Sequence, residues 1–122
     1  MEKHIDVMKQ SVELTETILE GLQHIQKLLG EGKFEETMYL FEDAVAGFTT
    51  IVRSIGPVQK ELNNDELETK INSVKNALDL VVGTYESNSH GKVQEIMQFT
   101  LVPQFMKLKQ ELERAFEPYL LS

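Results

Sequence analysis

Two glutamate–histidine pairs are the residues whose types and spacing come closest to a metal site. Glu20 with His24, and Glu86 with His90, stand four residues apart, a spacing that places two side chains on one face of a helix. Di-metal carboxylate sites in helical bundles use Glu-x-x-His pairs instead, and the sequence contains none. We therefore interpret both pairs as solvated surface groups and predict no metal, no cofactor and no catalytic residue.

Other catalytic chemistries also lack their residues. The chain has no cysteine, which excludes disulfides, zinc–thiolate sites and cysteine nucleophiles. His-Gly-Lys at 90–92 lacks the glycine spacing of a phosphate-binding loop, and neither a Gly-x-Ser-x-Gly motif nor a dinucleotide fingerprint occurs. We predict that the protein is not an enzyme.

The elements that carry these residues are predicted to be helices. Apolar residues recur at alternating steps of three and four in three windows, which is the period of an amphipathic helix. The predicted stripes are Ile5, Met8, Val12, Thr15, Leu19, Leu22, Gln26 and Leu29; Phe34, Met38, Phe41, Val45, Phe48, Val52 and Ile55; and Leu67, Ile71, Val74, Leu78, Val81 and Tyr85.

Turn-forming residues separate the windows. The expected helix ends are Gly30 with Gly32, Gly56-Pro57, and residues 86–91. Asn64, followed by two acids, is the expected N-cap of the third helix. The pattern makes no assignment for residues 57–63, although a short helical turn would fit.

A fourth helix is predicted over about residues 92–120. Its apolar stripe is Val93, Met97, Leu101, Phe105, Leu108, Leu112, Ala115 and Tyr119. The first three steps are all four residues long, so the stripe drifts, and Pro103 lies inside the drift. Proline cannot donate to the carbonyl of Phe99, so we expect one continuous helix with a kink at Pro103.

Four amphipathic helices with short connections predict one all-α domain, residues 1–122. The expected architecture is an antiparallel four-helix bundle with up-down-up-down topology.

Charge and hydropathy narrow the range of partners. The formal net charge is −8, which disfavours nucleic acid. Residues 91–122 carry four acids and four bases, so the whole net charge lies in residues 1–90. No apolar run is long enough for a membrane span, and the first residues do not have the pattern of a secretion signal, so we expect a cytoplasmic protein.

Apolar residues outside the stripes give the one indication of function. These residues are Tyr39, Leu40, Ile51, Phe99 and Met106. They either widen the faces that enter the core or form an exposed patch that binds something. We predict that Phe99, Pro103 and Met106 contact a partner, which is another protein or a second copy in a homodimer. The alternative is a metal-carboxylate or small-ligand-binding bundle enzyme.

The segment Leu101-Val-Pro-Gln-Phe-Met-Lys-Leu-Lys-Gln-Glu-Leu-Glu113 resembles the last helix of small uncharacterised cytoplasmic helical-bundle proteins of Gram-positive bacteria. The three earlier helices fit the same order and length. This resemblance implies a cytoplasmic helical bundle and carries no catalytic residues. In size, acidity and helicity alone, the chain is also similar to flagellar export chaperones, which implies an adaptor or chaperone-like role.

Overall fold

The computed structural model describes residues 2–121, so residues 1 and 122 of the predicted domain lie outside the described part. Helices make up 92% of the chain, and residues 2–121 contain no strand, which confirms the all-α prediction. The elements are a 3₁₀ turn (Glu2–His4), α1 (Ile5–Gly30), α2 (Phe34–Leu62), α3 (Asp65–Glu86), α4 (His90–Ile96), a π segment (Met97–Leu101) and α5 (Val102–Leu120).

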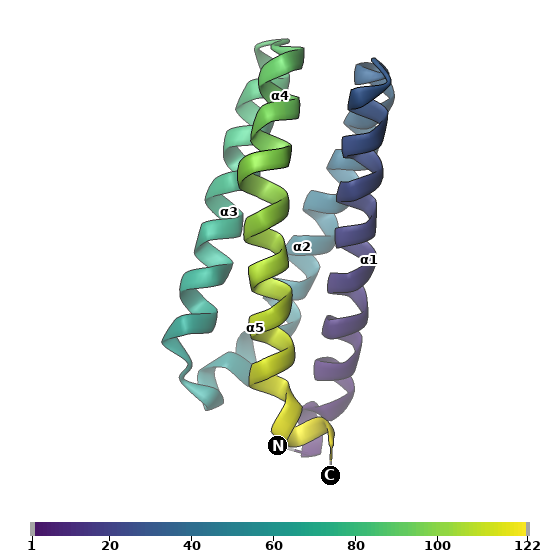
Figure 1. The fold of residues 1–122 in the computed structure, drawn as a ribbon. Helices are drawn as coiled ribbons and strands as arrows, with labels where there is room; N and C mark the ends of the chain where they lie inside the picture. Colours follow the sequence, from purple (N-terminus) through teal and green to yellow (C-terminus); the bar gives the residue numbers. More distant parts are fainter. Residues whose placement is uncertain (1, 122) are drawn as a thin grey trace.

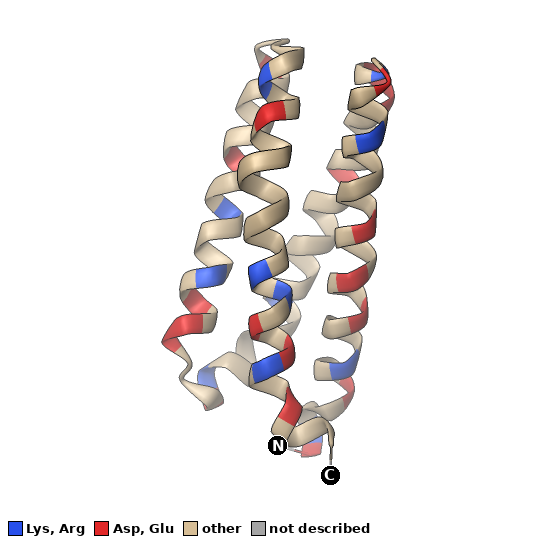
Figure 2. Ribbon diagram, viewed as in Figure 1, with Lys and Arg blue, Asp and Glu red and all other residues tan. Residues whose placement is uncertain are grey.

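The last three elements follow one another without a gap and form a single helix, which we call the C-terminal helix. Figure 1 shows the helices lying side by side along their lengths, with both termini and the α2–α3 connection at one end. α1 packs against α2 and α5, and α3 packs against α4 and α5, whereas α2 and α3 touch each other much less. Figure 2 shows charged residues along every helix, with a long uncharged stretch in the middle of the C-terminal helix.

The helix ends follow the expected turn chemistry at three positions. Gly32 adopts φ +78°, and the N–H of Lys33 bonds to the carbonyl of Leu28 at 3.0 Å, which is a Schellman motif after α1. Asn88, at φ 57°, fills the same role after α3. Asn64 caps α3 because its Oδ1 accepts the N–H of Leu67 at 3.1 Å.

The predicted end of the second helix at Gly56-Pro57 is wrong, since α2 continues to Leu62. A residue before proline normally avoids helical backbone angles because its Cβ meets the proline ring, but glycine has no Cβ. Pro57 therefore removes only the one hydrogen bond to the carbonyl of Arg53. Ile55 and Val58, on either side, are completely buried and hold this part of α2 against the core.

The buried face of α1 differs from the predicted stripe at four positions. Met8, Thr15, Leu22 and Leu29 are buried as expected, but the other core residues are Ser11, Ile18 and Ile25 instead of Val12, Leu19 and Gln26, and Ile5 is half-buried. The polar pair is accommodated because the Thr15 hydroxyl donates to the Ser11 carbonyl at 2.6 Å.

The buried face of α2 is shifted in the same way. Thr37, Ala44 and Ile51 are buried in place of Met38, Val45 and Val52, of which Met38 is exposed and the two valines are half-buried. α1 can approach this face closely because Gly47 has no side chain: a Cβ there would stand 2.9 Å from Ile18 Cδ1.

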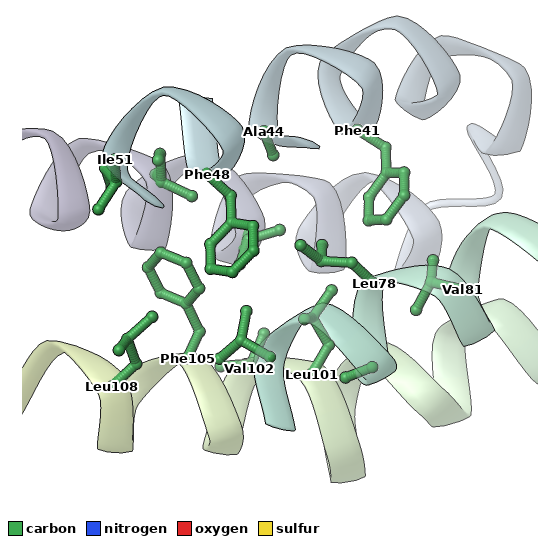
Figure 3. Packing of buried hydrophobic residues seen from close by; sticks show 14 of the residues in the cluster. Phe41, Ala44, Phe48, Ile51, Leu78, Val81, Leu101, Val102, Phe105 and Leu108 are labelled. Atoms are coloured by element: carbon green, nitrogen blue, oxygen red, sulfur yellow. The ribbon is translucent and has the colours of Figure 1, made fainter. Parts of the chain in front are cut away.

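The stripe of α3 is buried in full, as predicted. Figure 3 shows Phe48, Leu78 and Phe105, from α2, α3 and the C-terminal helix, pointing into one shared core.

Candidate functional site

The C-terminal helix passes through Pro103 without a break, and its irregular part begins before the proline. In the π segment the backbone hydrogen bonds are shifted by one residue, so that the N–H of Val102 bonds to the carbonyl of Met97, five residues back. The predicted continuity of this helix is therefore confirmed, and the sequence drift corresponds to an inserted residue in the helical ladder.

The π segment explains why the apolar stripe could advance in steps of four. Each such step rotates a position by about 40° around an α-helix of 3.6 residues per turn. Three steps in succession would carry Phe105 away from the core if the helix were regular. One π turn takes up the extra residue, and Val93, Met97, Leu101 and Phe105 are all fully buried.

A row of residues runs along the side of the C-terminal helix that faces away from the core. The two ends of the row stand three heptads apart in sequence, so the residue inserted between them turns these ends to different sides of the helix. All residues of the row are exposed except Pro103, which is half-buried. This outer stripe consists of Lys92, Glu95, Phe99, Pro103, Met106, Gln110 and Glu113.

The middle of the outer stripe is apolar, and we call Phe99, Pro103 and Met106 the Phe99 patch. Phe99 is 70% exposed and Met106 is 42% exposed. The alternative that Phe99 turns inward and belongs to the core is therefore excluded. The structure brings together the three residues that the sequence analysis selected and places them on the surface, whereas Ile51, selected by the same criterion, lies in the core.

The segment of helix that carries the Phe99 patch has no charged residue. Residues 96–106 contain no Asp, Glu, Lys or Arg, and Figure 2 shows a continuous tan stretch in the middle of the C-terminal helix. α1, by contrast, presents a row of glutamates, among them Glu16 and Glu20, which are exposed. The Phe99 patch is thus a neutral apolar area on an acidic protein.

Two backbone carbonyls beside the patch lack their usual donors. In an α-helix the carbonyl of Gln98 would accept the N–H of Val102, but that N–H bonds to Met97. The carbonyl of Phe99 would accept from residue 103, which is proline and has no N–H. Gln98 and Phe99 are both exposed, so these acceptors lie in the accessible part of the helix.

A second concave surface lies between α2 and α3. This groove has a volume of about 410 Å³, and Val45, Val52 and Ile71 contribute apolar lining. Arg53, Lys75 and Asp79 supply charged groups around it. α2 and α3 make little direct contact with each other.

The two glutamate–histidine pairs lie apart from further candidate metal ligands in residues 2–121. Within the described part of the chain, no three His, Asp or Glu side chains gather closely enough to hold a metal ion. Glu20 and His24 are exposed on α1. The His90 ring stacks on Phe34, with ring centroids 3.6 Å apart and planes 7° from parallel. His90 is therefore part of the packing at the end of the bundle.

The aromatic group around Phe34 also includes a buried tyrosine. Tyr85 lies between Phe34 and Phe41, at ring-centroid distances of 5.2 and 5.3 Å, and its hydroxyl lies 2.8 Å from Thr37 Oγ1. Burial raises the pKa of Tyr85, and the hydrogen bond with Thr37 partly opposes that shift. The phenol therefore stays neutral at physiological pH and joins α2 to α3.

Two ionic contacts fasten the opposite end of the bundle. Arg114 donates to Glu111 at 2.5 and 2.9 Å and to Glu66 at 2.8 Å, which links α5 to the start of α3. The hydrogen bonds from Arg114 lower the pKa of Glu111. His4 Nε2 lies 3.3 Å from Glu61 Oε1, and this contact lowers the pKa of Glu61. Neither contact lies on the Phe99 patch.

The family of the chain follows from its sequence match. A family model described as "Domain of unknown function (DUF8042)" matches residues 6–111. The chain belongs to the DUF8042 family. The matched part includes the π segment and the whole Phe99 patch, so both features lie within the DUF8042 domain. No curated protein and no solved structure matches the chain.

The helices of this DUF8042 domain do not have the properties of a membrane span. From residue 2 to residue 121, no helix is both long and apolar enough to cross a bilayer.

Proposed function

We propose that this chain is a non-enzymatic interaction module, adaptor-like or chaperone-like, that binds another polypeptide through the Phe99 patch. The observation that carries the proposal is the position of Phe99: it is 70% exposed in the middle of an uncharged stretch of eleven residues, 96–106. Single exposed apolar residues are normal on protein surfaces, but an aromatic residue grouped with Met106 and Pro103 is typical of an interaction site.

The chemistry of the patch fits a polypeptide partner. Phe99 and Met106 offer apolar anchors, and a methionine side chain adapts its shape to what it contacts. The carbonyls of Gln98 and Phe99 can accept hydrogen bonds from a partner's N–H groups. Since residues 96–106 are neutral, an acidic partner would not be repelled from this face, as it would be from α1.

The proposal includes the finer features of the fold and the setting. We propose an antiparallel up-down-up-down bundle, which the course of the chain in Figure 1 supports. We also propose that its last helix bends at Pro103. We further propose that the module acts in the cytoplasm and binds neither nucleic acid nor membranes. The net charge of −8 supports the exclusion of nucleic acid.

The alternative of a metal-carboxylate or small-ligand enzyme has weaker support. Its best candidates on α1, Glu20 and His24, are exposed, and His90 is engaged with Phe34. The lining of the α2–α3 groove fits a small apolar ligand better than either glutamate–histidine pair fits a metal ion. Nothing in that groove has the arrangement of a nucleophile and a base.

Site-specific photo-crosslinking tests the proposal. A photoreactive phenylalanine analogue replaces Phe99, Met106 or, as a matched control, Tyr39, which is an aromatic residue of α2 with 77% exposure. In cells that produce the chain naturally, we expect covalent polypeptide adducts from positions 99 and 106 and none from position 39. Equal labelling at all three positions, or none at 99 and 106, would refute a binding role for the patch.

A further inference from the structure

We infer that the α2–α3 groove is a binding site for a small amphiphile with one carboxylate and a medium-length alkyl chain, that is, a free fatty acid. The inference goes beyond the proposed function, because the groove lies between α2 and α3, whereas the Phe99 patch lies on the C-terminal helix. It assigns a second site, the chemical class of its ligand and the residues that hold each end of that ligand.

The apolar part of the groove includes residues that the bundle leaves partly uncovered. The heptad pattern predicts Val45 and Val52 in the core, but the structure leaves both half-buried along the groove. Phe48 and Leu78, each 5% exposed, belong to the core and line the same groove. An alkyl chain lying here would remove the two valines from water, which is the driving force for binding an apolar chain.

Two cations stand at one level of the groove, one on each helix. Arg53 lies ten residues before the α2–α3 connection, residues 63–64, and Lys75 lies eleven residues after it. At 1.5 Å per residue, their heights along the two helices differ by only about 1.5 Å. Both residues line the groove and are exposed, and within residues 2–121 neither forms an ion pair. Both cations are therefore available to an anion.

The charges around the groove match a single carboxylate. The planar guanidinium of Arg53 can donate two parallel N–H bonds to a carboxylate, and Lys75 supplies a second positive charge from the other helix. Asp79 is the one acid that lines the groove, so two cations and one acid give the lining a net charge of +1. A monoanion neutralises that charge, whereas a phosphate dianion would exceed it. On a chain of net charge −8, this groove offers an anion a locally positive site.

The order of residues along the groove sets the direction of the ligand. At the end nearer the connection, the lining consists of Ile71, which is buried, and the exposed amide of Asn72. Toward the other end the lining continues to Val45, eight residues from Arg53, which is about 12 Å along a helix. The carboxylate therefore lies between Arg53 and Lys75, and the alkyl chain extends toward Val45. The groove volume of about 410 Å³ lies within the range of small-ligand pockets.

NMR titration of the isotope-labelled chain with sodium decanoate measures the affinity. We expect one site with a dissociation constant of roughly 0.1–1 mM, because a small ligand in an open groove gains little free energy per atom. Acetate has the carboxylate without the chain, and decylammonium has the chain with a positive head group. Both should bind at least tenfold more weakly than decanoate. Equal affinity for decanoate and decylammonium would overturn the assignment of an anion site.

The same spectra locate the ligand. The methyl signals of Val45, Val52 and Leu78 should shift as decanoate is added. The methyl signals of Val12, a half-buried valine of α1, should not shift. Shifts centred on Val12 or Met106 would place the ligand on another surface and overturn the inference.

A matched pair of double variants tests the two cations. Arg53→Gln with Lys75→Gln should weaken decanoate binding at least tenfold, because the carboxylate loses both of its charged partners. Lys9→Gln with Lys27→Gln removes the same charge from exposed positions of α1 and should leave the affinity nearly unchanged, since distant exposed charges are screened by salt. Equal weakening by the two double variants would show an effect of net charge alone and overturn the site.

Phe99→Ser separates this inference from the proposed function. This variant should bind decanoate as the wild type does, because the α2–α3 groove is left intact. Loss of decanoate binding in Phe99→Ser would place the ligand on the Phe99 patch and overturn the inference. Absence of decanoate binding to the wild type would overturn it as well, while photo-crosslinking from positions 99 and 106 would still decide the proposed function.

Discussion

Replacing Phe105 and Phe99 by alanine, one at a time, compares a core position and a surface position of the same helix. Phe105 is 1% exposed, whereas Phe99 is 70% exposed. A buried phenylalanine truncated to alanine typically costs about 3–5 kcal/mol, because the lost transfer free energy and the residual cavity add together. We expect the free energy of unfolding to fall by that amount for Phe105→Ala.

The expected effect at Phe99 is much smaller. Full burial of a phenylalanine side chain contributes roughly 1.5–3 kcal/mol, and less than a third of Phe99 is removed from water. No closed cavity forms at an exposed site, and the greater helix propensity of alanine offsets about half a kcal/mol. We therefore expect Phe99→Ala to change the free energy of unfolding by less than about 1 kcal/mol.

Urea unfolding followed by far-UV circular dichroism measures both values. The slope of the free energy against urea should be the same for the two variants, so that the shift in midpoint reports stability alone. A loss at Phe99→Ala as large as that at Phe105→Ala would show that Phe99 is a core residue. The Phe99 patch would then not exist as a surface, and the reasoning built on it would fail.

Three further predictions concern the rest of the bundle. Phe41→Asp places an unpaired carboxylate in the core and should lower the free energy of unfolding by several kcal/mol, measured by thermal melting. Gly21→Ala, at an open helical site, should stabilise by about 0.5–1 kcal/mol, whereas Gly47→Ala should gain less or destabilise, because the added Cβ would stand 2.9 Å from a side chain of α1. Arg114 lowers the pKa of Glu111 below the ordinary 4.5. The stabilisation by this contact is therefore complete above pH 4.5 and is lost as the pH falls through the lowered pKa. Glu111→Gln should accordingly lose less stability between about pH 7 and pH 3 than the wild type.

Periodicity predicted the buried face of α3 completely, but it predicted only part of the faces of α1 and α2. Along α3 the sequence offers one apolar stripe. Along α2, Val45 and Val52 stand beside Ala44 and Ile51, and two overlapping heptad stripes are nearly equally apolar. Which stripe enters the core depends on the neighbouring helix, and the close approach of Ile18 to Gly47 is a tertiary contact that no local pattern contains.

The candidate site was predictable in its residues but not in its geometry. Phe99 and Met106 could be selected because they lie outside the apolar stripe of their helix. Three successive steps of four could also have indicated a π segment, but the same drift is compatible with a proline kink at Pro103. The inserted residue decides which positions on either side of it share a face of the helix, so this part of the geometry becomes visible only in the structure.

The most direct test of the central claim is the dissociation constant of the complex formed through the C-terminal helix, measured for Phe99→Ser and Tyr39→Ser. Both residues are exposed aromatics, so both variants should melt within a few degrees of the wild type. We predict binding at least tenfold weaker for Phe99→Ser and unchanged binding for Tyr39→Ser. Equal dissociation constants for the two folded variants would contradict the claim that the Phe99 patch is a binding surface.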